Sequence, residues 1–520
     1  MEKANNQQAN GIETKQGCLR YMLAAMLFCG VALNYIIKVM LSVAIVAMVK
    51  PHGHSDGSNN TNISTEDTCP GGEEESEETG QGGTFEWDGE MQGHILASYF
   101  YGYVATQLLG GWTADKLGGR WVYALGVMVT GILALFCPLA ANLHPTAFMA
   151  LRALQGAFSG VILPATNVLM SKWFAIEERP KISGLVFGGN YAGTLISMGL
   201  SGVLVDVMDW TSVFYVYGGA CILYVLPWLY LSSDTPEVHP RIGEKERDYI
   251  INGRREDIAK MEDQSQEQES FPVPWLSILT SLPFWANVVL QVGFTWLSYT
   301  LMTELPTYSK NILHFSLTKS GLISAFPYVF AWISGGVFGT VSSWLQARGY
   351  FSRMTAYIVF NGIAAIGPAI FLLLITLLGC DSTAIVVCFV AIATLKTGIY
   401  GGSMLNNLDL APNFVGSTTG ILYTLVNLTG VVSPIVNGAI TTGQQTLTKW
   451  HTVFYISIGT CVVPFIFFWI FGSVEEQTWN QPKGKEEVRK DSCKTSLKER
   501  RSVSYGSRSS PVSSLQDLHT

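Results

Sequence analysis

Long apolar runs separated by short polar segments occupy the chain from residue 20 to residue 473. A bilayer core about 30 Å thick needs roughly 20 apolar residues for each helix that crosses it. The runs reach that length, so the pattern predicts twelve transmembrane helices. They cover residues 20–49, 89–112, 121–141, 145–172, 181–205, 211–232, 282–304, 317–343, 354–378, 383–408, 413–440 and 450–473.

A polar segment of mixed charge separates the first six predicted helices from the last six, which predicts an all-α membrane protein made of two six-helix halves. The C-terminal segment is rich in Ser, Lys and Arg, a composition typical of disorder. The predicted organisation is a tail over 1–19, a bundle over 20–232 with an outer loop over 50–88, a linker over 233–281, a second bundle over 282–473 and a disordered tail over 474–520.

The distribution of Lys and Arg among the short loops predicts the orientation, because these residues favour the cytoplasmic side. If the N-terminus is cytoplasmic, the short outer loops hold only Lys310, Lys319 and Lys449. The short inner loops then hold Lys116, Arg120, Lys172, Arg179, Lys181, Arg348 and Arg353. We therefore expect both termini in the cytoplasm.

Loop 50–88 agrees with this orientation. It has no basic residue after Lys50, and it contains an acidic run over 73–78 and glycosylation sequons at Asn59 and Asn62. Cys69 lies in the same polar loop, where we expect it to face an oxidising compartment.

Composition narrows the function class. Hydrophobic residues make up 48% of the 520 residues and charged residues 14%, against about 25% charged in a typical soluble protein. This balance argues against a soluble enzyme, a disordered scaffold and a coiled coil. The net charge of −7 gives no case for nucleic-acid binding. The spans carry no pattern of a metal cluster, a Ser/His/Asp set or a phosphate loop, so we expect no enzyme and no cofactor beyond a coupling ion.

The loop between the second and third predicted helices contains a distinctive motif, Gly111-Trp-Thr-Ala-Asp115-Lys-Leu-Gly118-Gly-Arg120. Its glycines permit a tight turn, and Asp115 is suited to cap a helix or to pair with Arg120. The motif resembles the G-x-x-x-D-x-x-G-R signature of the major facilitator superfamily. Arg152-Ala-Leu-Gln155-Gly156 in the fourth span is similar to another motif of that superfamily, R-x-x-Q-G.

Further stretches narrow the resemblance to one family. They are Asn34-Tyr35 with Lys38 in the first span, Phe85-Glu-Trp-Asp88 before the second, Ser171-Lys-Trp-Phe174 after the fourth and Asn407-Leu-Asp-Leu-Ala-Pro412 after the tenth. Over residues 20 to 480 the chain resembles the anion:cation symporter family of sialin, the vesicular glutamate transporters and the type I sodium–phosphate cotransporters. This resemblance implies the major facilitator fold and transport of a small anion by alternating access.

Two cationic residues inside the first half suggest an anion site. Lys38 shares one face of its helix with Asn34, and Arg152 shares a face of the fourth span with Gln155. An intramembrane charge usually faces a cavity or a partner, because a charge at the bilayer centre costs about 2.5–3.5 kcal/mol on insertion scales. We expect these four residues to bind substrate. Pairing of the two cations with helix ends or backbone carbonyls is the structural alternative.

Two further ionisable residues lie in the second half. Glu304 is a candidate for ion coupling or for an outer gate, and an interfacial carboxylate that stays in water is the alternative. Lys396 lies in the middle of the tenth predicted span, where it either adds to the anion site or pairs with Glu304.

The chain departs from the family at several informative positions. The resemblance implies a glutamate in the fourth span of proton-coupled and vesicular members, and Ser159 holds that position here. Asn167 replaces a histidine, and Phe294 replaces an arginine of the glutamate carriers. These departures argue against glutamate loading, and the missing carboxylate weakens proton coupling because a proton relay needs a group that titrates.

The sequence therefore predicts a sodium-dependent phosphate symporter at the plasma membrane. The stretch from Met1 to Gly17 shows no acidic dileucine signal, which disfavours a lysosomal address. A proton-coupled carrier of organic carboxylates is the alternative within transport, and an anion channel is the alternative from another class.

Overall fold

A computed structural model gives the arrangement of the chain. It describes residues 18–50, 69, 83–174, 178–252, 273–443 and 445–480. The predicted glycosylation sites Asn59 and Asn62 and the tail beyond residue 480 lie outside the described residues.

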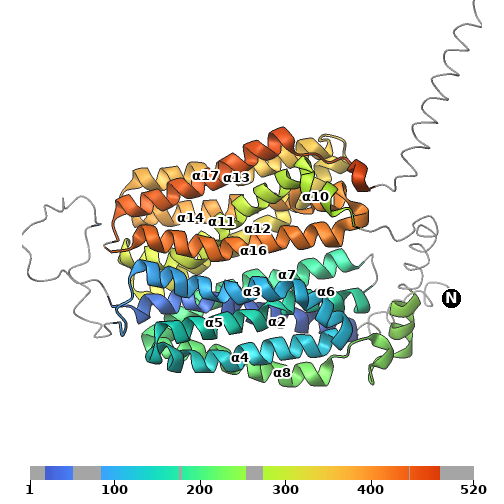
Figure 1. The fold of residues 1–520 in the computed structure, drawn as a ribbon, viewed down its shortest axis with the longest axis horizontal. Helices are drawn as coiled ribbons and strands as arrows, with labels where there is room; N and C mark the ends of the chain where they lie inside the picture. Colours follow the sequence, from blue (N-terminus) through green and yellow to red (C-terminus); the bar gives the residue numbers. More distant parts are fainter. Residues whose placement is uncertain are drawn as a thin grey trace, which may run out of the picture.

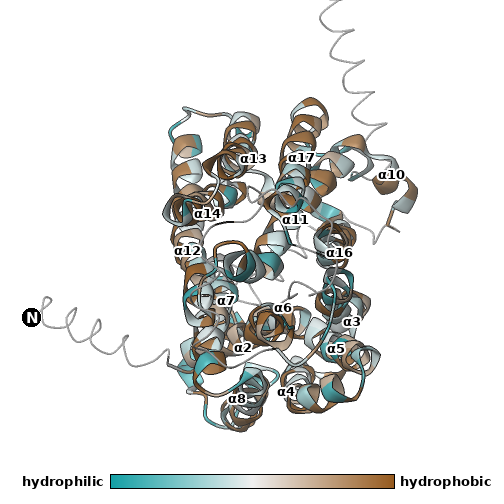
Figure 2. Cartoon of the chain, turned by 90° about the vertical axis from the view of Figure 1, so that its left-hand side faces the viewer, coloured by the Kyte–Doolittle hydropathy of each residue, from teal (hydrophilic) through white to brown (hydrophobic). Residues whose placement is uncertain are grey.

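The helices form two groups that lie side by side (Figure 1), and Figure 2 shows the same two groups from one end. The first group contains α2 (Cys18–Met48), α3 (Gly89–Leu117), α4 (Gly119–Leu143), α5 (Pro145–Gly160), α6 (Ile162–Trp173), α7 (Arg179–Val207) and α8 (Trp210–Leu231). The second contains α10 (Trp275–Thr280), α11 (Leu282–Asn311), α12 (Leu317–Ala347), α13 (Arg353–Leu378), α14 (Ser382–Lys396), α15 (Asn406–Leu410), α16 (Val415–Thr441) and α17 (Leu447–Phe471).

Every predicted span coincides with a helix or a pair of helices in the described part of the chain, and the all-α fold class is confirmed. Nine helical segments among the described residues are long and apolar enough to cross a membrane. The helices α3, α7 and α11 contain 29, 29 and 30 residues and complete the twelve crossings. They are more polar than the other spans, which is consistent with an internal position of some of their faces.

Two predicted spans differ in detail from the structure. The fourth is interrupted at Val161, because Pro164 has no N–H to bond with the carbonyl of Gly160. The tenth was expected as one helix over 383–408, but α14 ends at Lys396 and tighter 3-10 turns follow at Thr397–Tyr400. The glycines at 398, 401 and 402 weaken a regular helix there.

The interface between the halves is made mainly by two helix pairs, α3 with α16 and α7 with α12. We call the end of the bundle near Cys69 the Cys69 end, and the opposite end, which carries residues 233–252, the linker end. The largest hydrophobic core lies mainly within α2–α8 and extends to Tyr299 and Met302 of α11 and Ala325 of α12, while smaller cores lie mainly within α11–α17. Hydrophobic packing is therefore continuous across the interface between the halves.

At the Cys69 end the halves approach to backbone contact. A Cβ added to Gly438 of α16 would lie 2.3 Å from the carbonyl oxygen of Gly89, and one added to Gly93 would lie 2.4 Å from that of Pro434. Helices come this close only where small residues face each other. Toward the linker end, a Cβ added to Gly184 of α7 or to Gly336 of α12 would meet nothing within 4 Å. The halves are thus packed together at the Cys69 end.

A disulfide also joins the two halves at the Cys69 end. Cys69, from the loop that follows α2, is bonded to Cys380, from the turn between α13 and α14. Sequence analysis singled out Cys69 but not its partner, because Cys380 lies directly after an apolar span and looks like part of it.

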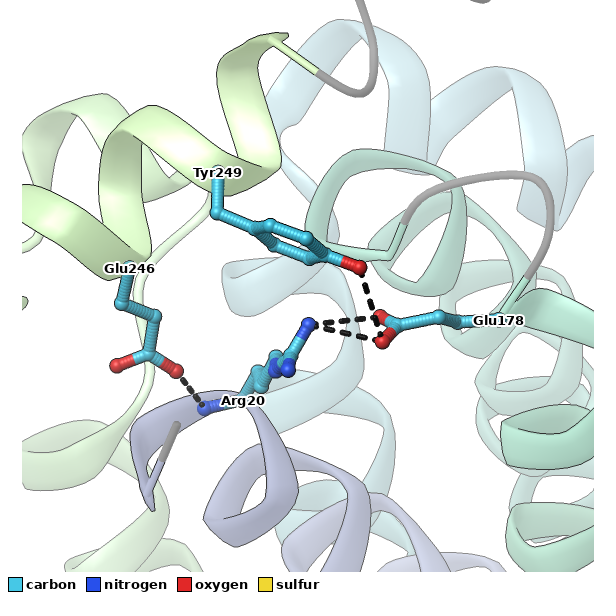
Figure 3. Close-up of polar contacts among 4 residues, drawn as sticks. All are labelled: Arg20, Glu178, Glu246 and Tyr249. Atoms are coloured by element: carbon cyan, nitrogen blue, oxygen red, sulfur yellow. Dashed lines mark hydrogen bonds and ion pairs between the residues drawn. The ribbon is translucent and has the colours of Figure 1, made fainter. Parts of the chain in front are cut away.

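At the linker end, a polar cluster holds three segments together (Figure 3). Arg20 Nη1 at the start of α2 donates to both carboxylate oxygens of Glu178, at 3.0 and 2.8 Å, and the Tyr249 hydroxyl donates to the same carboxylate at 3.3 Å. The backbone N–H of Arg20 donates to Glu246 Oε1 at 3.0 Å. The start of α2 and the helical residues 244–252 therefore lie at the same end of the bundle.

The crossing of α3 and α5 depends on Gly156, because a Cβ there would lie 1.8 Å from the carbonyl oxygen of Tyr99. We expect Gly156→Ala to destabilise the protein by about 1–3 kcal/mol through overpacking, and to lower the apparent Tm in detergent. Gly219→Ala is the matched control, since a Cβ on Gly219 meets nothing within 4 Å. Equal Tm values for the two variants would contradict this view of the crossing.

Candidate functional site

An aromatic cage surrounds Lys38 at the interface between the halves. The side chain of Lys38 comes from α2 and is 5% exposed. Its Nζ lies 4.2 Å from the ring centroid of Tyr103, 4.9 Å from Tyr35, 5.1 Å from Phe100 and 5.3 Å from Tyr299. The rings belong to α2, α3 and α11, so both halves contribute to the cage.

The charge of Lys38 has no carboxylate partner among the described residues. Its ammonium donates one hydrogen bond, to the Tyr299 hydroxyl at 3.3 Å. Aromatic faces attract a cation, by about 0.5–2 kcal/mol for each well-placed ring, but they do not neutralise it. Lys38 is therefore a buried lysine with no counter-charge among the described residues, and an anion bound at the interface would stabilise its ammonium form.

The hydrogen bond to Tyr299 continues across the interface. The Tyr299 hydroxyl donates to Asn427 Oδ1 at 2.9 Å, and Asn427 Nδ2 donates to Gln107 Oε1 at 2.9 Å. The resulting chain runs from α2 through α11 and α16 to α3, and it crosses between the halves twice. Sequence analysis missed Asn427 and Gln107, although a polar amide inside an otherwise apolar span was a signal that could have found them.

Arg152 is enclosed within the first half. It is 1% exposed, and its Nη1 donates to Gln155 Oε1 at 2.5 Å and to the carbonyl of Ile37 at 3.4 Å. Gln155 Nε2 in turn donates to the carbonyl of Thr130 at 2.9 Å. The two residues thus connect α5 with backbone carbonyls of α2 and α4. Such pairing with backbone carbonyls is what we expected if Arg152 has a structural role.

A second hydrogen-bonded chain links Asn34, Ser159 and Tyr99. The Ser159 hydroxyl donates to Asn34 Oδ1 and also bonds with the Tyr99 hydroxyl. The Tyr99 ring lies 4.8 Å from the Arg152 guanidinium and stacks on Tyr103, at 6.0 Å between centroids. All four residues proposed for substrate binding therefore belong to one connected region, in which Lys38 faces the interface between the halves and Arg152 lies inside the first half.

Glu304 and Lys396 have separate environments. Glu304 of α11 is 6% exposed and accepts a hydrogen bond from Thr303 at 3.3 Å. Lys396, the last residue of α14, donates to Ser298 at 3.0 Å. Among the described residues no ion pair joins Glu304 to Lys396, and the burial of Glu304 differs from that of an interfacial carboxylate in water.

The Gly111–Arg120 motif connects the turn between α3 and α4 with the end of α8 at the linker end. Arg120 donates its backbone N–H to Asp234 Oδ1 at 2.8 Å, and its Nη2 donates to the carbonyl of Leu229 at the end of α8. Gly118 adopts φ +91° in the turn between α3 and α4. The side chain of Asp115 lies outside the described part of the chain. These hydrogen bonds of Arg120 are thus with α8 and the residues after it, and its guanidinium also lies 5.2 Å from the ring centroid of Trp121.

Comparison with known proteins agrees with this fold and site. The family model described as Major Facilitator Superfamily matches residues 27–411. Human sialin is 38% identical over 88% of this chain and 90% of its own length. A Drosophila melanogaster protein with the provisional name of inorganic phosphate cotransporter is 34% identical over 90% of this chain and 87% of its own length. Bovine vesicular glutamate transporter 1 is 33% identical over 91% of this chain and 80% of its own length.

Solved structures show the same fold. A bacterial homologue of the human lysosomal transporter Spinster, in an inward-facing conformation, aligns with a TM-score of 0.63 at 13% identity, over 87% of this chain and 96% of that one. The xylose transporter XylE from E. coli aligns with a TM-score of 0.60 at 12% identity, over 87% of this chain and 99% of that one.

The chain belongs to the major facilitator superfamily, in the group that contains sialin, the vesicular glutamate transporters and the phosphate cotransporters. It is thus a membrane transporter and not an enzyme, as the sequence predicted.

The turn at Gly118 offers a test of the motif. A Cβ at this position would lie 2.7 Å from both carboxylate oxygens of Asp234, so we expect Gly118→Ala to lower the apparent Tm. Gly349→Ala is the matched control, because Gly349 also has a positive φ, +73°, but a Cβ there would meet nothing within 4 Å. Both variants place a Cβ at a positive φ, and Gly118, at φ +91° and ψ 129°, lies outside the left-handed helical region, which adds to the Tm loss expected there. A Tm loss no larger in Gly118→Ala than in Gly349→Ala would contradict a structural role of the Asp234 contact.

Proposed function

We propose that the protein transports inorganic phosphate together with sodium, by alternating access of a site between its two halves. The observation that carries this proposal is the Lys38 ammonium, which is buried between the halves with no carboxylate partner among the described residues. A lysine is a compact point charge of a kind that commonly binds phosphate. The family relatives named for phosphate support the same substrate class.

The neighbourhood of Lys38 also supports a small inorganic anion. Recognition of a carboxylate in two-point geometry favours an accessible guanidinium fork, whereas Arg152 is 1% exposed and its Nη1 is bonded to Gln155 and to the carbonyl of Ile37 within the first half. A single ammonium with hydroxyl neighbours suits phosphate, whose several oxygens accept hydrogen bonds from any direction. Three of the four rings in the cage carry a hydroxyl, namely those of Tyr35, Tyr103 and Tyr299.

The environment of Ser159 supports sodium in preference to the proton. This position, which is a carboxylate in proton-coupled members of the resembled family, holds a hydroxyl bonded to Asn34 and Tyr99. A hydroxyl does not titrate at physiological pH, so the first half lacks the proton relay that the resemblance would otherwise place there. We therefore assign the energy source to sodium.

The proposed orientation places both termini and the linker in the cytoplasm and loop 50–88 outside, at the plasma membrane. The Cys69–Cys380 disulfide supports this orientation, because disulfides form and persist in oxidising compartments. The contact of Arg20 with Glu246 supports a common side for the start of α2 and the linker. The excess of Lys and Arg in the short loops of that side agrees with it.

Uptake of labelled phosphate by cells that express the protein tests the proposal. We expect uptake in sodium medium and little in choline medium, at neutral pH as at mildly acidic pH. Lys38→Gln should reduce the initial rate about a hundredfold at equal surface expression, because a charged hydrogen-bonding group in a buried site is removed. Lys38→Arg keeps the charge and should retain more uptake than Lys38→Gln. Sodium-independent uptake, or full uptake by Lys38→Gln, would overturn the proposal.

Tyr299 links Lys38 to Asn427, and its hydroxyl is therefore a second test of the site. Tyr299→Phe keeps the ring near Lys38 but removes both hydrogen bonds of the hydroxyl, and we expect about a tenfold lower phosphate uptake efficiency. Tyr101→Phe is the control, since Tyr101 is on the exposed side of α3. Wild-type uptake in Tyr299→Phe would show that the hydroxyl plays no part in transport.

A proton-coupled carrier of organic carboxylates is the second candidate. The 38% identity to human sialin favours it. It predicts no phosphate uptake with either cation, and uptake of a carboxylate such as sialate that rises at acidic pH without sodium.

A further inference from the structure

A pair of tyrosine hydroxyls joins the two halves on the edge of the bundle formed by α7 and α12. The hydroxyl oxygens of Tyr191 of α7 and Tyr400 of η2 (Thr397–Tyr400) lie 2.8 Å apart and share a hydrogen bond. The 3-10 turn η2 continues the chain of α14 and packs against α12. A Cβ on Gly335 of α12 would lie 3.2 Å from the Tyr400 ring, so this ring rests on α12. The hydrogen bond therefore links the first half with the second.

The packing of α7 on α2 shows where this pair lies relative to Lys38. A Cβ on Gly189 of α7 would lie 2.6 Å from the carbonyl oxygen of Phe28 of α2, so these two positions are level. Both helices begin at the linker end, and Phe28 precedes Lys38 by ten residues, which is about 15 Å along a helix. Tyr191 follows Gly189 by only two residues. The tyrosine pair therefore lies on the linker side of the Lys38 backbone.

A second polar contact joins the halves on the opposite edge, formed by α3 and α16. Asn427 Nδ2 donates to Gln107 Oε1 at 2.9 Å. Helix α3 runs from Gly89 at the Cys69 end toward the linker end, and Gln107 follows Tyr103 of the cage by four residues, which is about one turn. This contact therefore also lies on the linker side of the cage. Figure 2 shows α7 and α12 on one side of the bundle and α3 and α16 on the other.

The exposed fraction of the side chains changes across these two contacts. Tyr400 is 43% exposed, although its hydroxyl bonds across the interface, and Tyr423, one turn nearer the linker end than Asn427 on α16, is 39% exposed. Lys38, on the other side of the contacts, is 5% exposed. The two contacts thus stand between exposed side chains toward the linker end and the enclosed cage.

We propose that the Tyr191–Tyr400 and Gln107–Asn427 contacts form the inner gate of the transporter, which closes the Lys38 site toward the linker end. Each contact joins the two halves, so the halves must break both contacts to separate at this level. All four side chains are neutral, and water replaces each lost hydrogen bond when the gate opens. This proposal rests on the anion site at Lys38 given above, but not on the identity of the anion or of the coupling ion.

One of the two contacts is connected to the anion site. Asn427 Oδ1 accepts from the Tyr299 hydroxyl, to which Lys38 donates. An anion that binds the Lys38 ammonium therefore acts on the Gln107–Asn427 contact through this chain. The hydroxyl pair on the other edge is the better place to test the gate, because its removal leaves the hydrogen bonds of Lys38 and Tyr299 intact.

The rate at which a reagent reaches position 38 tests the gate. Purified full-length Lys38→Cys protein in detergent is treated with an anionic methanethiosulfonate, and modification at position 38 is followed by mass spectrometry. Tyr191→Phe and Tyr400→Phe keep the rings but remove the shared bond, and each should raise the modification rate about three- to tenfold, the factor for one net hydrogen bond. Tyr215→Phe, at a 51% exposed position on α8, is the matched control and should leave the rate unchanged.

A double variant distinguishes a shared bond from two separate effects. Because the two hydroxyls form one hydrogen bond, the protein with both Tyr191→Phe and Tyr400→Phe should be modified no faster than either single variant. Gln107→Leu tests the opposite edge, and we expect it to raise the rate as well because it removes the bond to Asn427.

The outcomes separate the gate from the proposed function, because modification requires neither phosphate nor sodium. Unchanged rates in Tyr191→Phe and Tyr400→Phe, or effects that multiply in the double variant, would overturn the gate even in a protein that takes up phosphate. Faster modification in both single variants, with no further gain in the double variant, would support the gate even if cells take up no phosphate.

Discussion

The buried ammonium of Lys38 is the constraint on which the arrangement of the two halves depends. A charge of this kind costs about 2.5–3.5 kcal/mol on insertion scales, and no carboxylate offsets it in the described part of the chain. The rings that face it come from α2 and α3 in one half and from α11 in the other. Its stabilisation therefore changes when the halves move, and an anion bound beside it would change the balance between their positions.

Two helices of the second half connect this charge with the rest of the bundle. On α11, Tyr299 bonds with Lys38 while its neighbour Thr300 faces α16. On α16, Asn427 bonds with Tyr299 and with Gln107, and Gly438 contacts α3 three turns later. Because these contacts alternate between the halves along two rigid helices, a local change at one of them is passed to the others as a movement of the whole helix.

The sequence predicted the spans well because a bilayer imposes a length and a hydropathy on each helix, and those properties are local. Lys38 and Arg152 were found because charges in apolar runs are rare. Their different roles were not predictable, since the bond between Arg152 and the carbonyl of Ile37 depends on how α5 crosses α2. The contacts of Cys69 with Cys380 and of Asn427 with Gln107 were not predictable for the same reason, because each joins residues more than 300 positions apart.

The contacts at the Cys69 end suggest how the closed state is kept reversible. Gly89, Gly93 and Gly438 bring α3 and α16 together through backbone surfaces, and dispersion over such surfaces is short-ranged, since a gap of about 0.5–1 Å already removes a quarter to a half of it. Among the described residues no ion pair joins α3 to α16 at this end, so opening there avoids the cost of about 3–5 kcal/mol for breaking a buried ion pair. The buried side chain of Lys38 lies between the halves, so under the proposed function an anion bound there, and not a fixed ionic lock, would decide which end of the bundle is open.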